Sequence, residues 1–300
     1  MPGWLTYSAH EQFVAPARSA PQIWRLLLGL AVAAVVYLVL NQMLFRTLYR
    51  TLGDDGGTAL FTALQTGATP LAMYILLLSF GFMIMGAGVA ARIVHRRPAL
   101  SLLGPPRLAL RQFRSVIWMM FVVGAVIWLL PPWDMGAPLQ PNMPLGRWLM
   151  LLPLSLVAVL VQVSAEEIFF RGYVQQQLAA RFKSPLMWMV LPAVLFGLGH
   201  YLPGSAGANA GLIALWAAFF GILMADLTAR AGTLGPAIAV HFINNISAIL
   251  IVSMPDDLSG LALYLSPFSM DDTEALRAWL PVDFALMLVS WLAARLAIRR

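Results

Sequence analysis

Long, uninterrupted apolar runs constrain this chain more than any other feature of its sequence. A helix that crosses a bilayer needs about 20 mostly apolar residues, because the hydrocarbon core is about 30 Å thick. Eight runs reach or approach that length, and the fifth is the shortest. They are residues 23–45, 70–94, 115–132, 148–169, 186–202, 209–228, 235–253 and 281–298. The sequence therefore predicts an all-α fold, a polytopic membrane helical bundle with about eight transmembrane helices.

Composition supports this class and excludes others. The 300 residues are 60% hydrophobic and only 11% charged, whereas a soluble domain carries about 25% charged residues. The apolar runs are continuous, unlike the short alternating strands of an outer-membrane barrel. The net charge of +6 suits anionic lipid headgroups, so we expect the lipid bilayer and no nucleic acid as a partner. Cysteine is absent, which excludes disulfides and a thiol nucleophile.

Arginine placement predicts the orientation of the bundle, because cytoplasmic loops carry an excess of basic residues. Five arginines lie in 95–114, and further basic residues lie in 170–185 and at the C-terminus. This pattern predicts that both termini lie in the cytoplasm, and we expect the protein in a bacterial cytoplasmic (inner) membrane. The predicted loop 46–69 is the exception, because its Arg46 and Arg50 are assigned to the side of the membrane opposite the cytoplasm.

Three charged residues interrupt the apolar pattern in the segment VSAEEIFFRGYVQQQL. Glu167 and Arg171 are four residues apart, so on a helix they share a face and are predicted to pair. Glu166 is rotated by about 100° from Glu167. We therefore expect Glu166 to face a cavity as the titratable group, in the role of a general base. The alternative is an ion-pair cluster that only fixes helix packing.

Two histidines stand in apolar segments that follow the glutamates. His200 lies four residues after Phe196, and His241 lies four residues before Asn245, with Asn244 turned aside. A histidine of this kind can be an ordinary interhelical hydrogen-bonding group. No role is assigned to His10 or His95, and Asp226 near a helix end is interpreted as a snorkelling or capping residue.

The sequence spacing places Glu166 and His200 at the same height on two neighbouring predicted helices. Each lies 17 residues from Lys183, within the predicted turn RFKSP, so two helices that fold back there would bring them together. Glu166 and His200 are predicted to activate water, and His241 with Asn245 to stabilise an oxyanion. The combination predicts a hydrolytic site.

The motifs EExxxR, FxxxH and HxxxN, in this order, resemble those of the CAAX protease and bacteriocin-processing (CPBP/ABI) family, which includes the Rce1-type prenyl-protein endoprotease. The resemblance covers about residues 150–252. It implies an intramembrane endopeptidase of the glutamate type, which cleaves peptide bonds near the membrane-bound terminus of a protein or peptide, with or without an attached lipid. It implies that one pair activates the water, a second pair forms the oxyanion hole and a third pair supports them: Glu166 and His200, His241 and Asn245, and Glu167 and Arg171.

The family resemblance also divides the single membrane-embedded domain, residues 1–300. We expect N-terminal helices without a specific motif in 1–145, the catalytic core in 146–254, and an acidic outer loop with the last helix in 255–300.

Other functions stay open beside this interpretation. Glu166, His200 and His241 have the chemistry of a zinc site, although a metal-free enzyme without a cofactor is favoured. A non-catalytic membrane scaffold or bacteriocin-immunity-type protein would keep the fold without needing all six polar residues. An ion-coupled transporter would be expected to contain inverted repeats, and the sequence contains no visible repeat.

Overall fold

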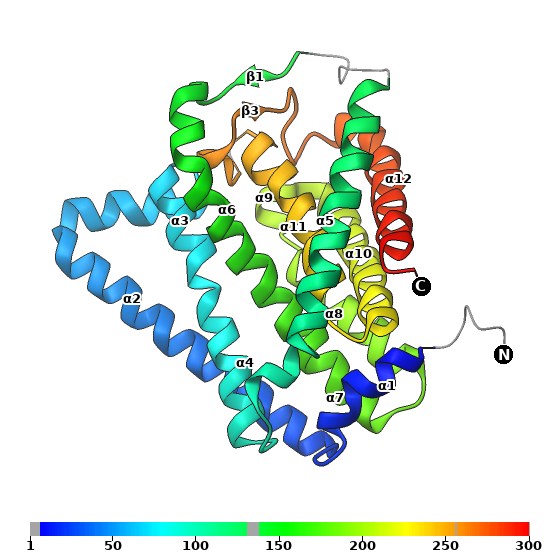
Figure 1. The fold of residues 1–300 in the computed structure, drawn as a ribbon. Coiled ribbons are helices and arrows are strands. Elements are labelled where there is room, and N and C mark those ends of the chain that lie inside the picture. Colours follow the sequence, from blue (N-terminus) through cyan, green and yellow to red (C-terminus); the bar gives the residue numbers. More distant parts are fainter. Residues whose placement is uncertain (1–6, 131–137, 256, 300) are drawn as a thin grey trace.

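The computed structural model describes residues 7–130, 138–255 and 257–299, without the Trp128 side chain, as a helical bundle (Figure 1). Within these ranges, 6 helices are long and apolar enough to cross a membrane. Two further apolar helices are shorter, Leu186–Gly199 and Gly235–Ile251. The all-α membrane bundle is confirmed, whereas the number of eight spans is not. The six long helices are Ile23–Thr66, Pro70–Ile93, Pro106–Ile127, Leu145–Arg181, Pro203–Ala231 and Thr273–Ala297.

The first long helix, α2 (Ile23–Thr66), is almost twice as long as the predicted span 23–45. It contains one bend, at Gly53, where φ is 70° and ψ is −180°. Only glycine adopts such a conformation readily, so the helix turns there and continues in a second arm. The prediction that 46–69 is a loop is therefore wrong over 46–66, because nothing before Gly53 breaks the helix. Gly67 ends α2 with a left-handed conformation.

The N-terminal part of the bundle is formed by the elements around α2. A short helix, α1 (Ser8–Val14), precedes a 3-10 turn, Ala15–Ala17. Helices α3 (Pro70–Ser79) and α4 (Gly81–Ile93) together form the second long helix. Both pack against α2, and α4 lies along it. A 3-10 turn, Ala99–Leu102, leads into α5 (Pro106–Leu129).

The central helix of the bundle is α6 (Leu145–Glu167), and the helical path that it begins runs to Arg181, past the predicted end at residue 169. A π-helical segment, Ile168–Gln175, follows it and leads into α7 (Gln176–Arg181). The predicted cytoplasmic loop 170–185 is therefore mostly helical. Wider π-helical turns within α-helices occur frequently at functional sites, and this one begins directly after Glu167.

The C-terminal half surrounds α6. A π-helical turn, Leu186–Val190, leads into α8 (Leu191–Gly199), which packs on α10 (Ala210–Ala231). Helix α11 (Gly235–Asn245) lies between α5, α6 and α10 and continues as a π-helical turn, Ile246–Ile251. The last helix is α12 (Thr273–Ala297). Short connecting helices complete this half: α9 (Pro203–Ala206), Gly207–Asn209 and Ser259–Leu261.

Three two-residue strands close one end of the bundle. They are β1 (Gln140–Pro141), β2 (Val252–Ser253) and β3 (Tyr264–Leu265). The central strand is β3, which pairs antiparallel with β1, with Gln140 opposite Leu265, and parallel with β2, with Val252 opposite Tyr264. This small sheet ties the connections after α5 and α11 together.

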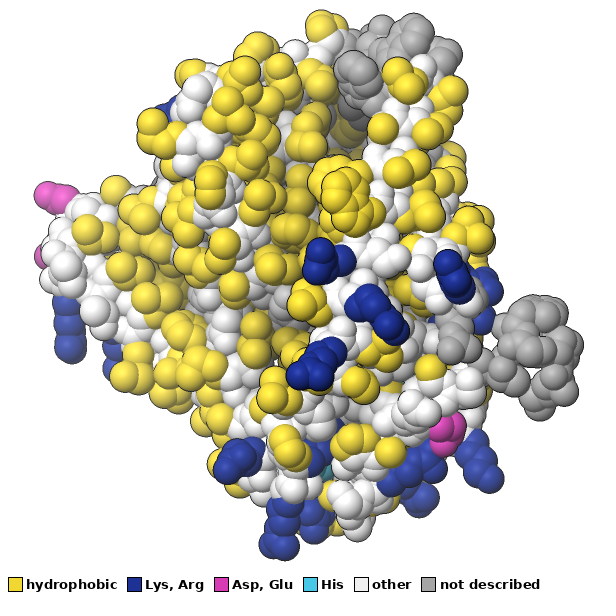
Figure 2. Space-filling view, in the orientation of Figure 1, with side chains coloured by type: hydrophobic (Ala, Val, Ile, Leu, Met, Phe, Trp, Pro, Cys, Tyr) yellow, Lys and Arg dark blue, Asp and Glu magenta, His cyan; other side chains and the backbone are white. Residues whose placement is uncertain are grey.

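The surface agrees with a membrane protein. Hydrophobic side chains cover much of the face in Figure 2, whereas Lys and Arg gather over its lower part, with a few beside α2. Long exposed apolar residues run along α2 and α5, including Leu38 at 63% and Trp118 at 71% exposure. Lipid is the environment in which such side chains are stable. The chain is therefore an integral membrane protein.

Candidate active site

The predicted ion pair is present at the end of α6. Arg171 Nη1 donates to Glu167 Oε1 at 2.9 Å, and both side chains are buried, at 1% and 0% exposure. The Arg171 guanidinium also donates to the Gly221 carbonyl on α10 at 3.3 Å. It lies 4.8 Å from the centre of the Phe196 ring on α8. Arg171 thus links α6, α8 and α10 around Glu167.

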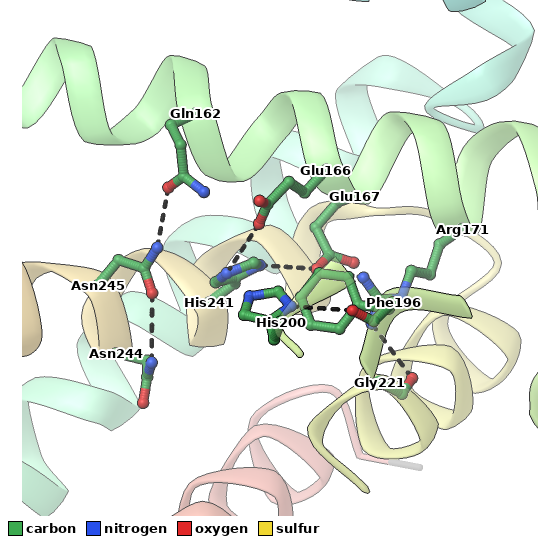
Figure 3. Close-up of polar contacts among 10 residues, drawn as sticks. All are labelled: Gln162, Glu166, Glu167, Arg171, Phe196, His200, Gly221, His241, Asn244 and Asn245. Atoms are coloured by element: carbon green, nitrogen blue, oxygen red, sulfur yellow. Dashed lines mark hydrogen bonds and ion pairs between the residues drawn. The ribbon is translucent and has the colours of Figure 1, made fainter. Parts of the chain in front are cut away.

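His241 on α11 lies between the two glutamates (Figure 3). Its Nδ1 is 2.8 Å from Glu167 Oε1, and its Nε2 is 3.4 Å from Glu166 Oε2. Sequence spacing predicted a different neighbour for Glu166, namely His200. The histidine in direct contact with Glu166 is His241, because α11 packs along α6 and presents its ring to both carboxylates.

The charges of this buried group require a proton. Two carboxylates, Glu166 and Glu167, face one guanidinium, Arg171, so the ionised group without a proton on His241 would carry a net charge of −1. Burying an unbalanced charge is costly. One additional proton, held on either Glu166 or His241, makes the group neutral. The contact between these two side chains is therefore a place where a proton can be held and moved.

His200 lies immediately after α8, in the same group of side chains (Figure 3). Its Nδ1 is 2.9 Å from the Phe196 carbonyl oxygen, which can only accept a hydrogen bond. Nδ1 therefore carries a proton, and in the neutral ring Nε2 is left as an acceptor. Glu166 interacts electrostatically with both His241 and His200. The close approach of the two helices that Lys183 separates is thus present, without a direct bond between Glu166 and His200 among the described contacts.

Asn245 belongs to a separate chain of amides at the side of Glu166. Its Nδ2 donates to Gln162 Oε1 at 2.8 Å, and its Oδ1 accepts from Asn244 Nδ2 at 3.2 Å. The Gln162 side chain is also placed to donate to the Glu166 carboxylate. Sequence reasoning missed Gln162, although it lies four residues before Glu166 and therefore shares its helix face. Asn244, expected to turn aside, instead holds the Asn245 carbonyl.

The carboxylates keep unused hydrogen-bonding capacity. Glu166 Oε2 and Glu167 Oε2 are buried, and neither makes a hydrogen bond within the part of the chain that the structure describes. Buried polar atoms are nearly always hydrogen-bonded, and exceptions concentrate where an atom has a chemical task. Glu166 Oε2 is also the atom that approaches His241, so it combines an open lone pair with a neighbouring proton carrier.

A metal-binding arrangement is not found among the described residues, where no three His, Cys, Asp or Glu side chains are grouped to hold a metal ion. The three candidate ligands of the zinc alternative, Glu166, His200 and His241, lie near one another. The His200 and His241 Nδ1 atoms are held by Phe196 and Glu167, so a metal ion could be bound only through the Nε2 atoms of these rings.

Comparison with known proteins supports the resemblance that the three motifs carry. Residues 148–247 match the family model described as type II CAAX prenyl endopeptidase Rce1-like. The chain is 24% identical over 260 residues to YyaK of Bacillus subtilis (strain 168), an uncharacterized protein, and the match covers 83% of this chain and 85% of that one. No solved structure matches the chain. All six motif residues fall inside 148–247, which is the segment that forms the site. The resemblance that its three motifs indicate is thus confirmed: residues 148–247 of this integral membrane protein are similar to the Rce1-like CAAX prenyl endopeptidases.

Proposed function

We propose that this protein is an intramembrane endopeptidase that hydrolyses a peptide bond near the membrane-bound terminus of a protein or peptide. The observation that carries the proposal is the contact of Glu166 Oε2 with His241 at 3.4 Å, in a buried group of otherwise matched charges. An Rce1-like segment supports a CAAX-type membrane protease in general. The roles of individual residues are part of the proposal.

In the first step, Glu166 acts as the general base and His200 positions the water. The water oxygen attacks the carbonyl carbon of the scissile bond, and Glu166 accepts a proton from it. His200 receives a hydrogen bond from the same water at Nε2, because its Nδ1 proton is held by the Phe196 carbonyl at 2.9 Å. The product of this step is a tetrahedral intermediate with a negatively charged oxygen.

The second pair stabilises that oxygen. His241, protonated at Nε2 while Nδ1 is held by Glu167 at 2.8 Å, supplies one donor. Asn245 supplies the other from the second N–H of the amide that already donates to Gln162. Donors that are fixed before the reaction cost no reorganisation when charge develops. The C–N bond then breaks as Glu166 returns its proton to the leaving nitrogen, which gives a carboxylic acid and an amine. The acid then transfers its remaining proton to the amine or to solvent and leaves as a carboxylate.

Glu167 and Arg171 act through other residues. Glu167 orients the His241 ring, and Arg171 compensates the Glu167 charge at 2.9 Å. Neither group touches the reacting atoms in this scheme, so both are positioning residues. We propose that the reaction needs no metal ion. Resistance to a chelator supports this version, and loss of activity that zinc restores would replace it with the zinc-dependent one.

The proposal includes a location, the bacterial cytoplasmic membrane with both termini in the cytoplasm. The gathering of basic side chains over one part of the surface supports this orientation. A reporter enzyme fused after Arg300 and active only in the cytoplasm tests it. Activity only of a periplasmic reporter at the same position would reverse the orientation.

The central test is proteolysis of lipid-anchored peptides by purified protein in nanodiscs, with products identified by mass spectrometry. Glu166→Gln keeps the size of the side chain and removes the base, and His200→Ala removes the water-positioning ring. We expect cleavage by the wild type and none above background by either variant. Equal cleavage by Glu166→Gln would end the catalytic assignment, and no cleavage by any form would favour the scaffold or immunity-type alternative.

A further inference from the structure

A groove of about 740 Å³ runs along α2 outside the catalytic group. Aromatic and apolar residues form much of its wall, with Asn41 and Gln42 at one end and two arginines toward the bend of the helix. The residues that carry the argument are Asn41, Phe45, Arg46, Tyr49, Arg50 and Phe61.

Two glycines build this groove by bending α2 back on itself. The positive φ of Gly53 turns the second arm of the helix toward the first. A Cβ atom at Gly57 would lie 2.6 Å from the Tyr49 ring, so only glycine permits this close approach. Phe61 on the second arm then lies 5.8 Å from Phe45 and 5.9 Å from Tyr49, between ring centres. The aromatic wall is thus a consequence of the bend.

Arg46 and Arg50 give the groove its charge. They are four residues apart, so they lie on one face of α2, and both are exposed. Neither takes part in an ion pair with any described residue, unlike Arg18 and Arg171. These two arginines are also the basic residues that depart from the predicted charge distribution across the membrane. A binding site for an anion would account for Arg46 and Arg50 on the side of the membrane where basic residues are otherwise few.

One end of the groove lies near Tyr37, one turn before Asn41 on the same helix. Asn41 Nδ2 donates to the Tyr37 carbonyl at 3.0 Å. Tyr37 is close enough to Glu166 for the two side chains to interact electrostatically. The Asn41 end is therefore the end of the groove that faces Glu166.

We propose that this groove binds the part of the substrate next to the cleaved bond, and that Arg46 and Arg50 recognise a peptide carboxylate there. The inference rests on the proposed protease function and adds a substrate class to it. Arg46 and Arg50 lie 9 and 13 residues after Tyr37, or about 13 and 20 Å along the helix axis. An extended peptide covers about 3.3 Å per residue, so the carboxylate belongs about four to six residues from the scissile bond.

The experiment compares paired lipid-anchored peptides that differ only in Asp or Asn, placed at each position from two to eight residues from the cleaved bond. Proteins are held in nanodiscs of uncharged phosphatidylcholine. The kcat/KM ratio of each Asp to Asn pair is measured for wild type, for Arg46→Gln/Arg50→Gln, and for Arg114→Gln as a control at an exposed arginine on α5.

We expect wild type and Arg114→Gln to prefer Asp by about fivefold, through KM, at positions four to six only, because exposed ion pairs contribute modestly. The ratio falls to about one in the double Gln variant. Arg46→Glu/Arg50→Glu reverses the preference, so that Asn peptides are cleaved faster than Asp peptides at the same positions, which shows that the variant is folded and that charge is recognised.

Equal treatment of Asp and Asn by wild type at all positions would overturn the proposal. So would a preference that the double variant keeps. Binding of anionic phosphatidylglycerol that depends on Arg46 and Arg50, with no peptide preference, would identify a lipid site instead. If no peptide is cleaved, the proposed function fails by itself, and the groove is tested through the Kd of the same Asp and Asn pairs for Glu166→Gln.

Discussion

Two buried carboxylates in this protein, Asp226 on α10 and Glu166 on α6, have opposite surroundings. Asp226 accepts four hydrogen bonds between 2.8 and 3.0 Å, from Tyr7, from Trp291 and twice from Arg230. Burial and the Asp226 carboxylate raise the pKa of Tyr7 to about 12, so its hydroxyl stays a donor. The interpretation of Asp226 as a snorkelling or capping residue is wrong, because it lies within α10 and is only 7% exposed.

Glu166 is buried to a similar degree, at 8% exposure, yet its Oε2 makes no hydrogen bond among the described residues. The difference separates two uses of a charge in a membrane protein. A carboxylate whose oxygens all accept hydrogen bonds holds elements together, here α1, α10 and α12. It has no lone pair left for chemistry. A carboxylate with an oxygen that accepts no hydrogen bond, beside a histidine, destabilises the fold but remains available to a substrate or a proton.

The largest expected effect is on activity at Glu166. Glu166→Gln removes the base while leaving the contact partners in place, so we expect kcat to fall by about 10³-fold or more. The thermal unfolding temperature should not fall, because the substitution also removes a buried charge. The measurement is single-turnover peptide cleavage beside the unfolding temperature. A loss of activity that merely follows a loss of folded protein would remove the contrast with Asp226.

The reverse outcome is expected at Asp226. Asp226→Ala leaves a buried arginine without its carboxylate, which destabilises the protein by about 3 kcal/mol. The cleavage rate of the remaining folded protein should stay within about threefold of the wild type, since Asp226 is saturated and apart from the catalytic group. Denaturant unfolding and kcat of the folded fraction check this. A specific loss of kcat at full stability would show that Asp226 takes part in the reaction.

Much of this contrast was accessible from sequence and part of it was not. Helical spacing alone predicts the Glu167–Arg171 pair, because both residues lie on one helix and their separation is fixed by its geometry. Spacing predicts the approach of His200 to Glu166. It does not predict the direct contact of Glu166 with His241, since contacts between helices depend on packing that spacing does not contain. The three residues that donate to Asp226 lie far apart in the sequence, and a single sequence cannot bring them together.

The fold shows the same division. Hydropathy predicts the all-α membrane bundle, because the bilayer fixes the length of an apolar helix. It misplaces helix ends, as in α2, where a helix continues past its apolar part until Gly53 bends it. His10 and His95 were left without a role, although both are buried. A histidine beside apolar residues, without a motif around it, gives no signal that distinguishes packing from exposure.

A smaller effect is expected at Gln162, which joins the two halves of the catalytic group. Gln162→Leu removes the acceptor of the Asn245 amide, 2.8 Å away, and leaves that donor free to turn away from the oxyanion. We expect kcat to fall by about thirtyfold, or about 2 kcal/mol, with KM nearly unchanged. Gln162→Glu restores an acceptor and should recover part of the rate. A loss confined to KM would assign Gln162 to substrate binding.

The smallest effect is expected at His10, which tests whether α1 is held by groups that must stay uncharged. Burial against α7 and α10, with a further contribution from Arg18, lowers the pKa of His10 to about 4. Its ring lies 4.4 Å from that of Trp188.

The unfolded segment, with a pKa near 6.5, binds a proton first as the pH falls. The stabilisation is therefore complete above about pH 6.5 and is lost progressively toward pH 4. Between pH 7 and 5.5 the protection of Ser8–Val14 against hydrogen exchange, corrected for intrinsic rates, should fall by about 1 kcal/mol. In His10→Gln the protection should be lower at pH 7 and should depend less on pH. An unchanged pH dependence would assign the effect to His95, whose pKa is also lowered to about 4 by burial and by Arg97.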